Sequence, residues 1–533
     1  DGHRTASVLQ INNETEAEVM DRTLMSTPYA LLETPPRVLL LGEAGGTNVW
    51  LAARYAAPEI HVVQPDQNIT GLLRGPLREY GGHVYDRPEV EIYSTEPRHF
   101  IENTIVRFDL IQLVAMESWA AASGGLEGLG QDHLMTVEGM TASLQQLSTD
   151  GILFVCRGIQ IPPRDNVKLL ATFIDALRNI GVTRPADHIA IVRDYLGVCT
   201  MVRKRPWTPE ERDALRVLCR DRTLTLVYFT GIRPDELNHP DQLPGPSDGS
   251  GDWLYYAATA LLSDDASTFA DEWPFDIRPP TDDRPFFANF SKLDILETLE
   301  RLEADFWSTQ TELALLFVIA AMIIIAISGG LMTTLPLLLV RRIRKTNGLG
   351  STALYFIAIG LAYLMLEITM LSRLNNLLGD PVQAGAATIA GFLLFSGLGS
   401  LVSSKVETSH VMTVRWLMLT LVFVGMLEIW LIDPVTALTG SWPLWFRFII
   451  GILVISPMAF LMGFPMPVAL VKLERKSPVL LPWAWGVNGF ASVLASPLAT
   501  AIGMSVGFQA AGVTALGCYL VAAVLIGRIP AQD

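Results

Sequence analysis

The chain of 533 residues has little charge and little cysteine. Only 17% of its residues are charged, whereas soluble proteins average about 25%. Its four cysteines form no Cys-x-x-Cys pair and no cluster with histidine, which argues against zinc, covalent haem, iron–sulfur ligation and a disulfide scaffold. With 50% hydrophobic residues the chain is not disordered. What remains is a composition that leans towards a membrane protein.

The few charges are divided unevenly along the chain. Residues 313–533 contain seven acidic and twelve basic residues, a net charge of +5. Residues 1–312 contain 47 acidic and 27 basic residues, a net charge of −20. Because an acidic region is repelled by phosphate backbones, nucleic acid is not an expected partner. The composition predicts an acidic soluble region followed by a membrane region.

A membrane-spanning helix needs about 20 mostly apolar residues. Seven segments meet this requirement: 313–340, 353–372, 384–403, 415–432, 446–464, 483–505 and 508–527. Prolines 457, 465, 467 and 497 are expected to kink the fifth and sixth spans. If the spans alternate, ten of the twelve basic residues fall on one side of the membrane. The positive-inside rule places that side in the cytoplasm and the acidic region on the other side.

Two acids, Glu367 and Glu428, lie inside the predicted spans. Charged groups at this depth are costly, so one interpretation is a proton or ion relay. The other is a carboxyl group paired with a polar group or a neighbouring helix, with Arg373 as a candidate partner of Glu367. We favour the paired interpretation.

The acidic region opens with a pattern typical of a nucleotide-binding α/β unit. Residues 37–42 (RVLLLG) predict a strand, residues 43–46 a glycine turn and residues 47–56 a helix. Glycine lets the backbone approach a ligand, and the helix N-terminus favours its negative groups. Further strands are predicted at 59–64, 90–94, 108–114, 151–157, 189–193 and 198–203, with helices at 133–148 and 165–180. The expected fold is a Rossmann-like, seven-strand-type α/β sheet of the kind that binds S-adenosylmethionine derivatives, followed by an all-α bundle of about seven transmembrane helices.

We divide the chain into four parts: an N-terminal remnant with lead-in strands at 1–36, a Rossmann-like domain at 37–206, an extension that wraps back to the membrane at 207–312 and the membrane bundle at 313–533. Thr208 and Glu211 have the spacing of a capping box at a helix start. The segment 273–290 (WPFDIRPPTDDRPFFANF) is expected to wrap back onto the domain before the chain enters the membrane. We interpret its acid pair, Asp282 and Asp283, as a structural junction rather than an active site.

Several segments together resemble one known family. GEAGG follows the first strand, VVQPD ends the second, EVEIYSTEPRHF precedes residues 108–114, and DDRPFF precedes a membrane region containing LEITMLSRL, GFPMPVAL and PWAWGVNGFASV. Over nearly its whole length the chain resembles bacterial integral membrane spermidine synthase-like proteins, in which an aminopropyltransferase-type Rossmann domain is joined to transmembrane helices. The resemblance also implies further membrane helices upstream of Asp1.

The resemblance implies a cosubstrate site that this chain fills only in part. In soluble spermidine synthases, an acid in the glycine loop and another at the end of strand two hold decarboxylated S-adenosylmethionine. The corresponding positions read Ala44, with Glu43 beside it, and Gln64. Glu96 fits the acid that faces the adenine.

The implied catalytic position departs from the family pattern. A D-x-x-D pair after strand four binds and deprotonates the amine in the soluble enzymes, and here it reads Val114 and Glu117. An amine must lose a proton before it attacks carbon, and valine cannot accept one. Asp109 or Glu117 could substitute, but Asp109 belongs to the start of its strand, where an acid commonly has other roles. We therefore expect that aminopropyl transfer is lost.

Three functions follow, in order of preference. The first is a pseudoenzyme: a non-catalytic structural or docking subunit of a membrane complex, without cofactor. It would lie in a bacterial inner membrane with its soluble domain on the periplasmic side, where a cytosolic cosubstrate would be lacking. Its partners would be the lipid bilayer and other protein subunits. The second is a membrane-bound aminopropyltransferase or methyltransferase, with Glu117 as base and decarboxylated S-adenosylmethionine or S-adenosylmethionine bound by Gly42, Glu43, Gly45, Gly46, Gln64 and Glu96. The third is transport of a polyamine or an ion past Glu367 and Glu428.

Overall fold

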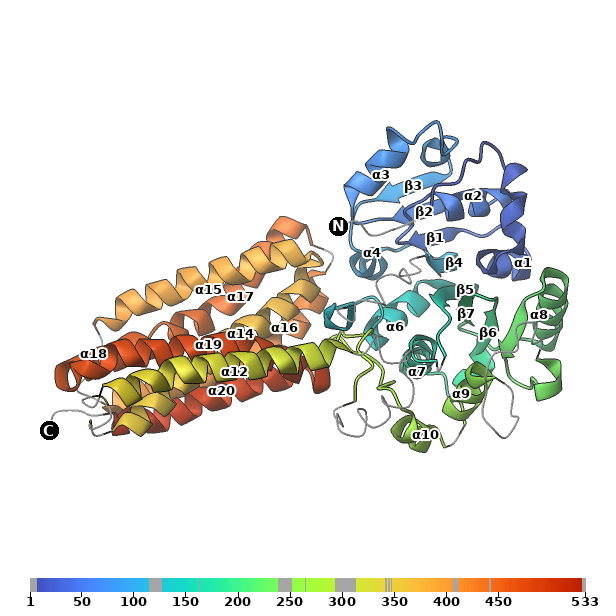
Figure 1. Cartoon of the computed structure of the whole chain (residues 1–533). Helices are drawn as coiled ribbons and strands as arrows, with labels where there is room; N and C mark the ends of the chain where they lie inside the picture. The colour runs from blue at the N-terminus through green and yellow to red at the C-terminus, as the bar shows by residue number, and fades with distance from the viewer. Residues whose placement is uncertain are drawn as a thin grey trace. The chain divides into compact units, whose positions relative to one another are not determined.

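The computed structural model describes residues 7–529 except 115–126, 162, 238–251, 264, 293–312, 341–342, 344–345, 347, 406–410 and 441. The chain forms two compact units, Asp1–Ala314 and Leu315–Asp533. Figure 1 shows that the first unit is an α/β structure and the second is a set of long helices. Each unit is considered on its own.

Among the described residues, eight strands form one sheet in the order β3-β2-β1-β4-β5-β7-β6-β8. They are β1 (Val38–Leu41), β2 (Ile60–Val63), β3 (Val90–Tyr93), β4 (Phe108–Leu113), β5 (Leu147–Gly158), β6 (Ile189–Arg193), β7 (Gly197–Val202) and β8 (Thr225–Tyr228). The first five are parallel, β7 is antiparallel to β5, and β6 is antiparallel to β7 and β8. The predicted seven-strand fold is confirmed, with β8 from the region expected as an extension added at the edge. The described part of 1–36 forms short helices, so the lead-in strands expected there are wrong.

The central strand β1 shows why this sheet is buried on both faces. Leu39 and Leu41 belong to one hydrophobic core, and Val38 and Leu40 belong to the other. Such unbroken apolar strands are typical of parallel sheets covered by helices on both sides. One face packs against α4 (Pro97–Asn103), α6 (Val137–Gln145), α7 (Asp165–Asn179) and α9 (Trp253–Leu261), and the other against α1 (Thr27–Leu31), α2 (Thr47–Arg54) and α8 (Pro209–Arg222).

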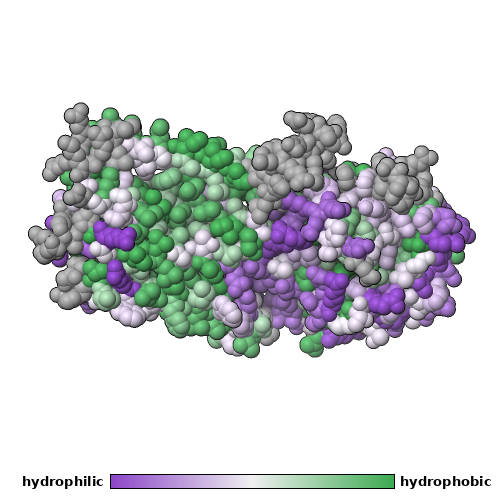
Figure 2. Space-filling view, turned by 90° about the horizontal axis from the view of Figure 1, so that it is seen from below, coloured by the Kyte–Doolittle hydropathy of each residue, from purple (hydrophilic) through white to green (hydrophobic). Residues whose placement is uncertain are grey.

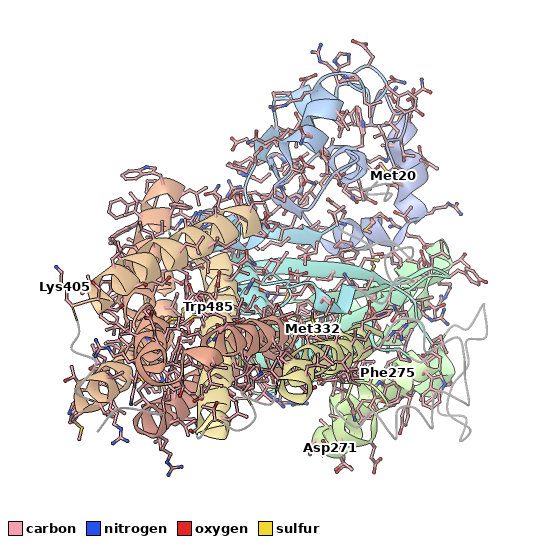
Figure 3. The ribbon with its side chains drawn as sticks, turned by 60° about the vertical axis from the view of Figure 1, so that its left-hand side comes forward. Met20, Asp271, Phe275, Met332, Lys405 and Trp485 are labelled. Atoms are coloured by element: carbon pink, nitrogen blue, oxygen red, sulfur yellow. The ribbon has the colours of Figure 1, made fainter. Side chains whose placement is uncertain are left out.

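Two expectations about the α/β unit are met in detail. Thr208 and Glu211 form the capping box at the start of α8. Residues 273–290, here called the wrap segment, pack onto the α/β core through buried aromatic side chains, among them Phe275, which Figure 3 labels. The Trp273 indole donates a hydrogen bond to Pro163 O at 3.2 Å. Cys199 and Cys219, whose redox state the sequence leaves open, are both buried free thiols.

Within its described residues, the second unit has seven helical segments that are long and apolar enough to cross a membrane, which indicates a multi-pass membrane protein. They are α12 (Leu313–Leu339), α14 (Leu349–Leu378), α15 (Pro381–Ser403), α16 (Val411–Thr439), α17 (Leu444–Met462) with α18 (Pro465–Lys476), α19 (Leu481–Ser505) and α20 (Phe508–Leu525). Figure 2 shows a broad hydrophobic surface on this unit. Met332 and Trp485, which Figure 3 labels, are 77% and 58% exposed.

The fifth span is interrupted rather than merely kinked. Helix α17 ends at Met462 and α18 begins at Pro465, whereas Pro457 and Pro497 lie inside continuous helices. Proline at the first helical position needs no hydrogen-bond partner for its nitrogen, so it starts α18 without cost. Helix α19 continues through Pro497, and the kink expected in the sixth span stays a prediction.

Hydrogen bonds at one end of the bundle show how the helices alternate. Lys472 Nζ donates to Ile526 O at 2.7 Å, and Arg415 Nε donates to Ala523 O at 3.2 Å. The beginning of α16 and the ends of α18 and α20 therefore meet at one end of the bundle. We call this the basic end, defined by Arg415, Lys472 and Arg528.

Candidate functional site

The carboxyl edge of the parallel strands gathers the positions that the sequence predicts for a cosubstrate. The glycine loop follows β1, Gln64 follows β2, Glu96 follows β3 as the N-cap of α4, and Val114 follows β4. Because β1 to β4 are parallel neighbours, these positions lie along one edge of the sheet. This is the edge at which a doubly wound α/β fold ordinarily binds its ligand.

The glycine loop requires glycine at two positions for conformational reasons. Gly42 has φ +79° and Gly46 has φ +75°, a region that favours glycine. Gly46 is the N-cap of α2, and a Cβ atom on it would lie only 2.7 Å from Val84 Cγ1. The loop therefore keeps the tight turn of a ligand-binding fold.

The Glu43 carboxylate folds back into this loop and occupies its donors. The residue is only 1% exposed. Its Oε1 accepts from the backbone nitrogens of Gly45 at 2.8 Å and Gly46 at 2.6 Å, and its Oε2 accepts from Asn48 N at 3.3 Å and Asn48 Nδ2 at 2.7 Å. These N–H groups stand at the start of α2, where an anionic ligand group would otherwise bind. The chain fills its own anion site.

Gln64 is engaged at both ends of its side chain. It is 5% exposed, Nε2 donates to Glu43 O at 3.1 Å, and Oε1 accepts from Asp66 N at 3.1 Å. The amide thus ties the end of β2 to the glycine loop. The two predicted cosubstrate residues do meet, but their polar atoms bind each other and the surrounding backbone.

Two buried tyrosines show that the surroundings of Glu43 are dry. Burial raises the pKa of Tyr29 well above its ordinary value, and the charge on Glu43 raises it further. The same two causes, in the same order, raise the pKa of Tyr85. The Tyr29 hydroxyl donates to Gln112 Oε1 at 3.3 Å. The carboxylate therefore relies on the N–H groups of the loop for its hydrogen bonds.

The position expected for the catalytic base carries no acid in the described part of the edge. Val114 is half-buried, and its backbone nitrogen donates to Leu41 O at 3.0 Å. Glu117 lies in 115–126, outside the described residues. Asp109 accepts from Arg37 N at 3.0 Å and from Ser148 Oγ at 2.6 Å, so it joins the starts of β1 and β4 to β5 at the opposite edge. This agrees with the non-catalytic interpretation of Asp109.

Asp282 fastens the wrap segment to the domain. Its carboxylate accepts from Thr136 Oγ1 at 2.7 Å and from Arg98 Nη2 at 3.3 Å, and its backbone nitrogen donates to Glu138 Oε2 at 3.0 Å. Burial alone would raise the pKa of Asp282, but the neighbouring His133, whose Nδ1 lies 3.8 Å from Oδ1, and the charge of Arg98 outweigh it and hold the pKa below its usual range. These contacts support a structural junction.

Lys168 on α7 is a buried polar residue that the sequence reasoning missed. It is 2% exposed, and its Nζ donates to Asn289 O at 2.6 Å and to Phe286 O at 3.3 Å in the wrap segment. Burial lowers the pKa of this amine to about 7. A single lysine in an otherwise apolar helix face (VKLLATFIDAL) was the available signal.

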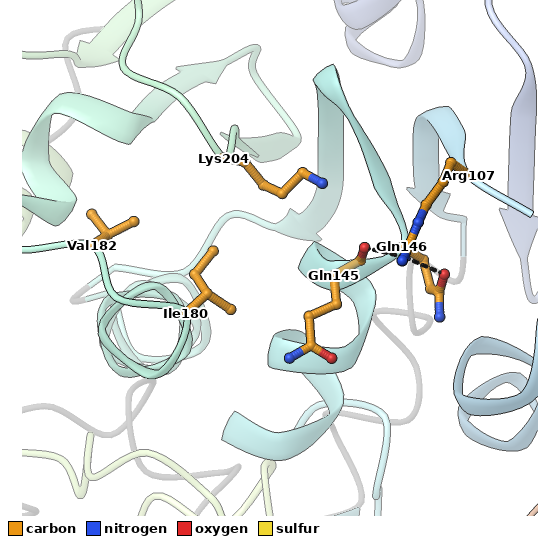
Figure 4. A pocket seen from close by; sticks show the side chains of 6 residues that line it. All are labelled: Arg107, Gln145, Gln146, Ile180, Val182 and Lys204. Carbon is orange, nitrogen blue, oxygen red and sulfur yellow. Dashed lines mark hydrogen bonds between the residues drawn. The ribbon is translucent and has the colours of Figure 1, made fainter. Parts of the chain in front are cut away.

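A cavity of about 390 Å³ lies at the amino ends of β4 and β5, away from the glycine loop (Figure 4). Arg107 and Lys204 line it. Arg107 donates to Gln145 O and to Gln146 Oε1, and Lys204 donates to Leu147 O. Since Gln145 ends α6, both cations offset the negative end of that helix. We assign them this structural role.

Of the two intramembrane acids, Glu428 is held by a neighbouring helix. It is 5% exposed, and its Oε1 accepts from Met458 N of α17 at 2.9 Å. Its Oε2 has no hydrogen-bond partner among the described residues. Arg373 pairs with Asp433 of α16 at 2.8 Å rather than with Glu367. The expected partner of Glu367 was therefore wrong, because Asp433 competes for the guanidinium.

The comparisons with known proteins concern the fold. No protein-family description and no curated protein matches the chain. Spermidine synthase from Thermotoga maritima is 19% identical over 36% of this chain and 62% of that chain, with a TM-score of 0.27. A probable spermidine synthase from Corynebacterium glutamicum is 14% identical over 39% and 72%, and human methyltransferase-like protein 13 in complex with SAH is 12% identical over 38% and 91%, both with a TM-score of 0.27.

The structural neighbours are thus spermidine synthases and methyltransferases, and the match spans about three fifths of the Thermotoga enzyme. At such low identity and TM-score the likeness adds nothing to the argument. The fold assignment rests on the strand order and register given above.

Proposed function

We propose that the α/β unit is a spermidine synthase-like domain that no longer transfers aminopropyl groups and serves as a structural or docking module in a membrane complex. The observation that carries this proposal is that the glycine loop and the end of β2 are bonded to each other: the Glu43 carboxylate caps the α2 N-terminus, and Gln64 Nε2 donates to Glu43 O. The carboxylate of S-adenosylmethionine would have to displace Glu43 from several charge-assisted hydrogen bonds, each worth about 1.5–3 kcal/mol. Decarboxylated S-adenosylmethionine has no anionic group, and its ribose would find an amide already bonded at position 64 instead of a carboxylate.

Two further features support the loss of transfer chemistry. Gln64 stands where the resemblance implies an acid for the ribose hydroxyls, and both ends of its amide are already bonded. Val114 stands where it implies the acid that deprotonates the amine. A protonated amine is not nucleophilic, and valine at this position cannot accept its proton; Glu117, the other member of the implied pair, lies outside the described residues.

The charges at the two ends of the bundle support an orientation. At the basic end, Arg415, Lys472 and Arg528 form no ion pair with a carboxylate among the described residues, whereas Arg373, beyond the middle of α14, pairs with Asp433. By the positive-inside rule we place the basic end in the cytoplasm. Helix α12 starts from the opposite end, so the α/β unit belongs on the outer, periplasmic side of a bacterial inner membrane, remote from a cytosolic cosubstrate.

Ligand binding to the full chain in detergent tests the proposal. Isothermal titration with S-adenosylmethionine, decarboxylated S-adenosylmethionine and 5′-methylthioadenosine should give no binding heat, and putrescine should not be aminopropylated. A soluble spermidine synthase in the same detergent is the positive control. Tight binding followed by turnover would overturn the proposal and favour the membrane-bound transferase.

The docking role has its own readout. Extracted gently from its native membrane, a chain of 58.5 kDa should migrate with further protein subunits in a complex well above its own mass. Migration as a monomer or as a homo-oligomer only would contradict the docking role, without bearing on the lost chemistry.

A further inference from the structure

The membrane unit contains a cavity of about 210 Å³ that the proposed function does not use. Its polar lining comes from α14, α19 and α20, and two methionines flank it at the break between α17 and α18. These residues are Tyr363, Asn488, Ser492, Tyr519, Met462 and Met466. For scale, a cavity of about 150 Å³ can bind benzene.

The cavity lies near the middle of the helices that enclose it. Tyr363 is the fifteenth of the 30 residues of α14, and Ser492 is the twelfth of the 25 residues of α19. Pro465, where α18 begins, lines the cavity and accepts a hydrogen bond from the Tyr355 hydroxyl at 2.8 Å. Interrupted helices at membrane depth are tolerated where they line a cavity, and they commonly build ligand sites in membrane proteins.

Loose packing of the helices does not account for the cavity. A Cβ atom on Gly360 would lie 2.6 Å from Asn488 O, so α14 and α19 are already at their closest approach beside it. On α15, a Cβ atom on Gly399 would lie 1.9 Å from Phe460 O of α17. The helices touch backbone to backbone around the cavity, and the space between them is kept open.

The lining offers a ligand hydrogen-bond acceptors as well as the hydroxyls of Tyr363 and Tyr519, which can donate or accept. Asn488 Nδ2 donates to Phe356 O at 3.0 Å, and the Ser492 hydroxyl donates to Gly360 O at 3.3 Å. What these side chains have left are the Asn488 carbonyl oxygen, one amide hydrogen and the lone pairs of the Ser492 oxygen. Neither a basic nor an acidic side chain is among the described residues that line the cavity.

This chemistry discriminates by charge. The described lining offers an anion hydroxyl and amide donors but no cation, whereas an ammonium group can donate to the Asn488 and Ser492 oxygens and is also attracted to tyrosine rings. We propose that the cavity binds a small primary ammonium ion through Asn488, Ser492 and the tyrosines. The proposal uses only the membrane unit and does not depend on the function proposed for the α/β unit.

Cysteine reactivity in the full chain in detergent tests this. In a Cys518→Ala background, Ser492→Cys places a near-isosteric thiol on the cavity wall. It should react with cationic aminoethyl methanethiosulfonate. The measured quantity is the labelling rate with this reagent divided by the rate with anionic sulfonatoethyl methanethiosulfonate. For the cavity cysteine this ratio should be about tenfold higher than for free mercaptoethanol. Ethylammonium should slow the labelling, and acetate at the same concentration should not.

The same helix supplies the matched control. Ala495 is 0% exposed and does not line the cavity, so Ala495→Cys should resist both reagents. If Ser492→Cys fails to fold, Met466→Cys repeats the test from the other side of the cavity. Lack of reaction at the cavity cysteine, or reaction without preference for the cation, would overturn the proposal.

Discussion

The buried amine of Lys168 allows a quantitative test of how the wrap segment is held. Its Nζ donates to Asn289 O at 2.6 Å and Phe286 O at 3.3 Å, and the Phe290 ring lies 5.2 Å away. Burial is the main cause that lowers the pKa of this amine from 10.5 to about 7. The lowering corresponds to about 5 kcal/mol by which the folded environment disfavours the charged amine.

The sign of the pH dependence follows from proton counting. Below pH 7 the amine is protonated in both the folded and the unfolded chain, so the penalty on its charge acts in full. Between pH 7 and 10.5 the folded chain releases the proton while the unfolded chain keeps it, so the free energy of unfolding rises with pH. From pH 7 to pH 9 this rise amounts to about 2 kcal/mol.

Lys168→Met removes the titration and keeps an unbranched apolar side chain of similar length. It also leaves two buried carbonyl groups without their donor, at about 1–3 kcal/mol each, which opposes the relief of the charge penalty. The change in opening free energy at a single pH is therefore uninformative, whereas the dependence of this free energy on pH is diagnostic. The opening free energy of residues 275–290, measured by hydrogen exchange on the full chain in detergent, should increase from pH 7 to pH 9 by about 2 kcal/mol more in the native protein than in the variant.

Lys204→Met is the matched control. Burial also lowers the pKa of Lys204, but this amine donates to Leu147 O and not to the wrap segment. Its replacement should leave the pH slope at residues 275–290 unchanged. Parallel pH profiles for the native protein and Lys168→Met would refute the assignment of a neutralised amine to this site.

Three further predictions concern the glycine loop and the orientation. Gln64→Glu should lower the free energy of unfolding by about 2–3 kcal/mol, since it replaces the donor to Glu43 O with an oxygen, and a denaturant titration measures this. Gly46→Ala should destabilise by about 2 kcal/mol or more, because of its positive φ and the contact with Val84. In the same titration Gly71→Ala, whose Cβ meets nothing within 4 Å in α3, should be neutral or slightly stabilising, and equal effects at both glycines would contradict this reasoning. The third prediction concerns the orientation: Ile105→Cys, at a position 94% exposed, should be labelled by an impermeant maleimide in intact spheroplasts. Ser404→Cys, at the end of α15, should be labelled only after lysis. The reverse pattern would invert the orientation.

Much of the fold was predictable because it follows from long apolar runs and from the glycine and proline residues that end them. The strand after Arg37 ends in a glycine turn, and the spans are apolar enough to be found by length alone. The interruption at Gly463 was harder to place. Prolines 457, 465 and 467 all suggested a kink, but only the pair at 465 and 467 coincides with the break. A proline in the middle of a span can be absorbed by its neighbours, so the sequence alone does not rank them.

The sequence predicted where the candidate site lies, but not what its polar side chains bind. A strand end, a glycine loop and a helix start place Glu43 and Gln64 at one edge of the sheet whatever they bind. A carboxylate near a helix N-terminus can receive a ligand or cap its own helix, and the sequence pattern is the same in both cases. The distances of 2.6 and 2.8 Å to Gly46 and Gly45 decide in favour of the cap. For Lys168 the decisive partners lie about 120 residues away in the chain.

On the proposed function, Glu43 and Gln64 are two parts of one change. A glycine loop that holds no ligand leaves buried N–H groups without acceptors, at about 1–3 kcal/mol each. Glu43 supplies a permanent acceptor from within the loop, which turns the Glu43 carbonyl towards β2. That carbonyl accepts from Gln64 Nε2 at 3.1 Å and from the Tyr85 hydroxyl at 3.5 Å. A carboxylate at position 64 could not donate, whereas the amide donates to Glu43 O and still accepts from Asp66 N. The glutamine at the end of β2 thus gives the Glu43 cap its shorter hydrogen bond, and restoring an acid there would remove that bond without creating an empty site.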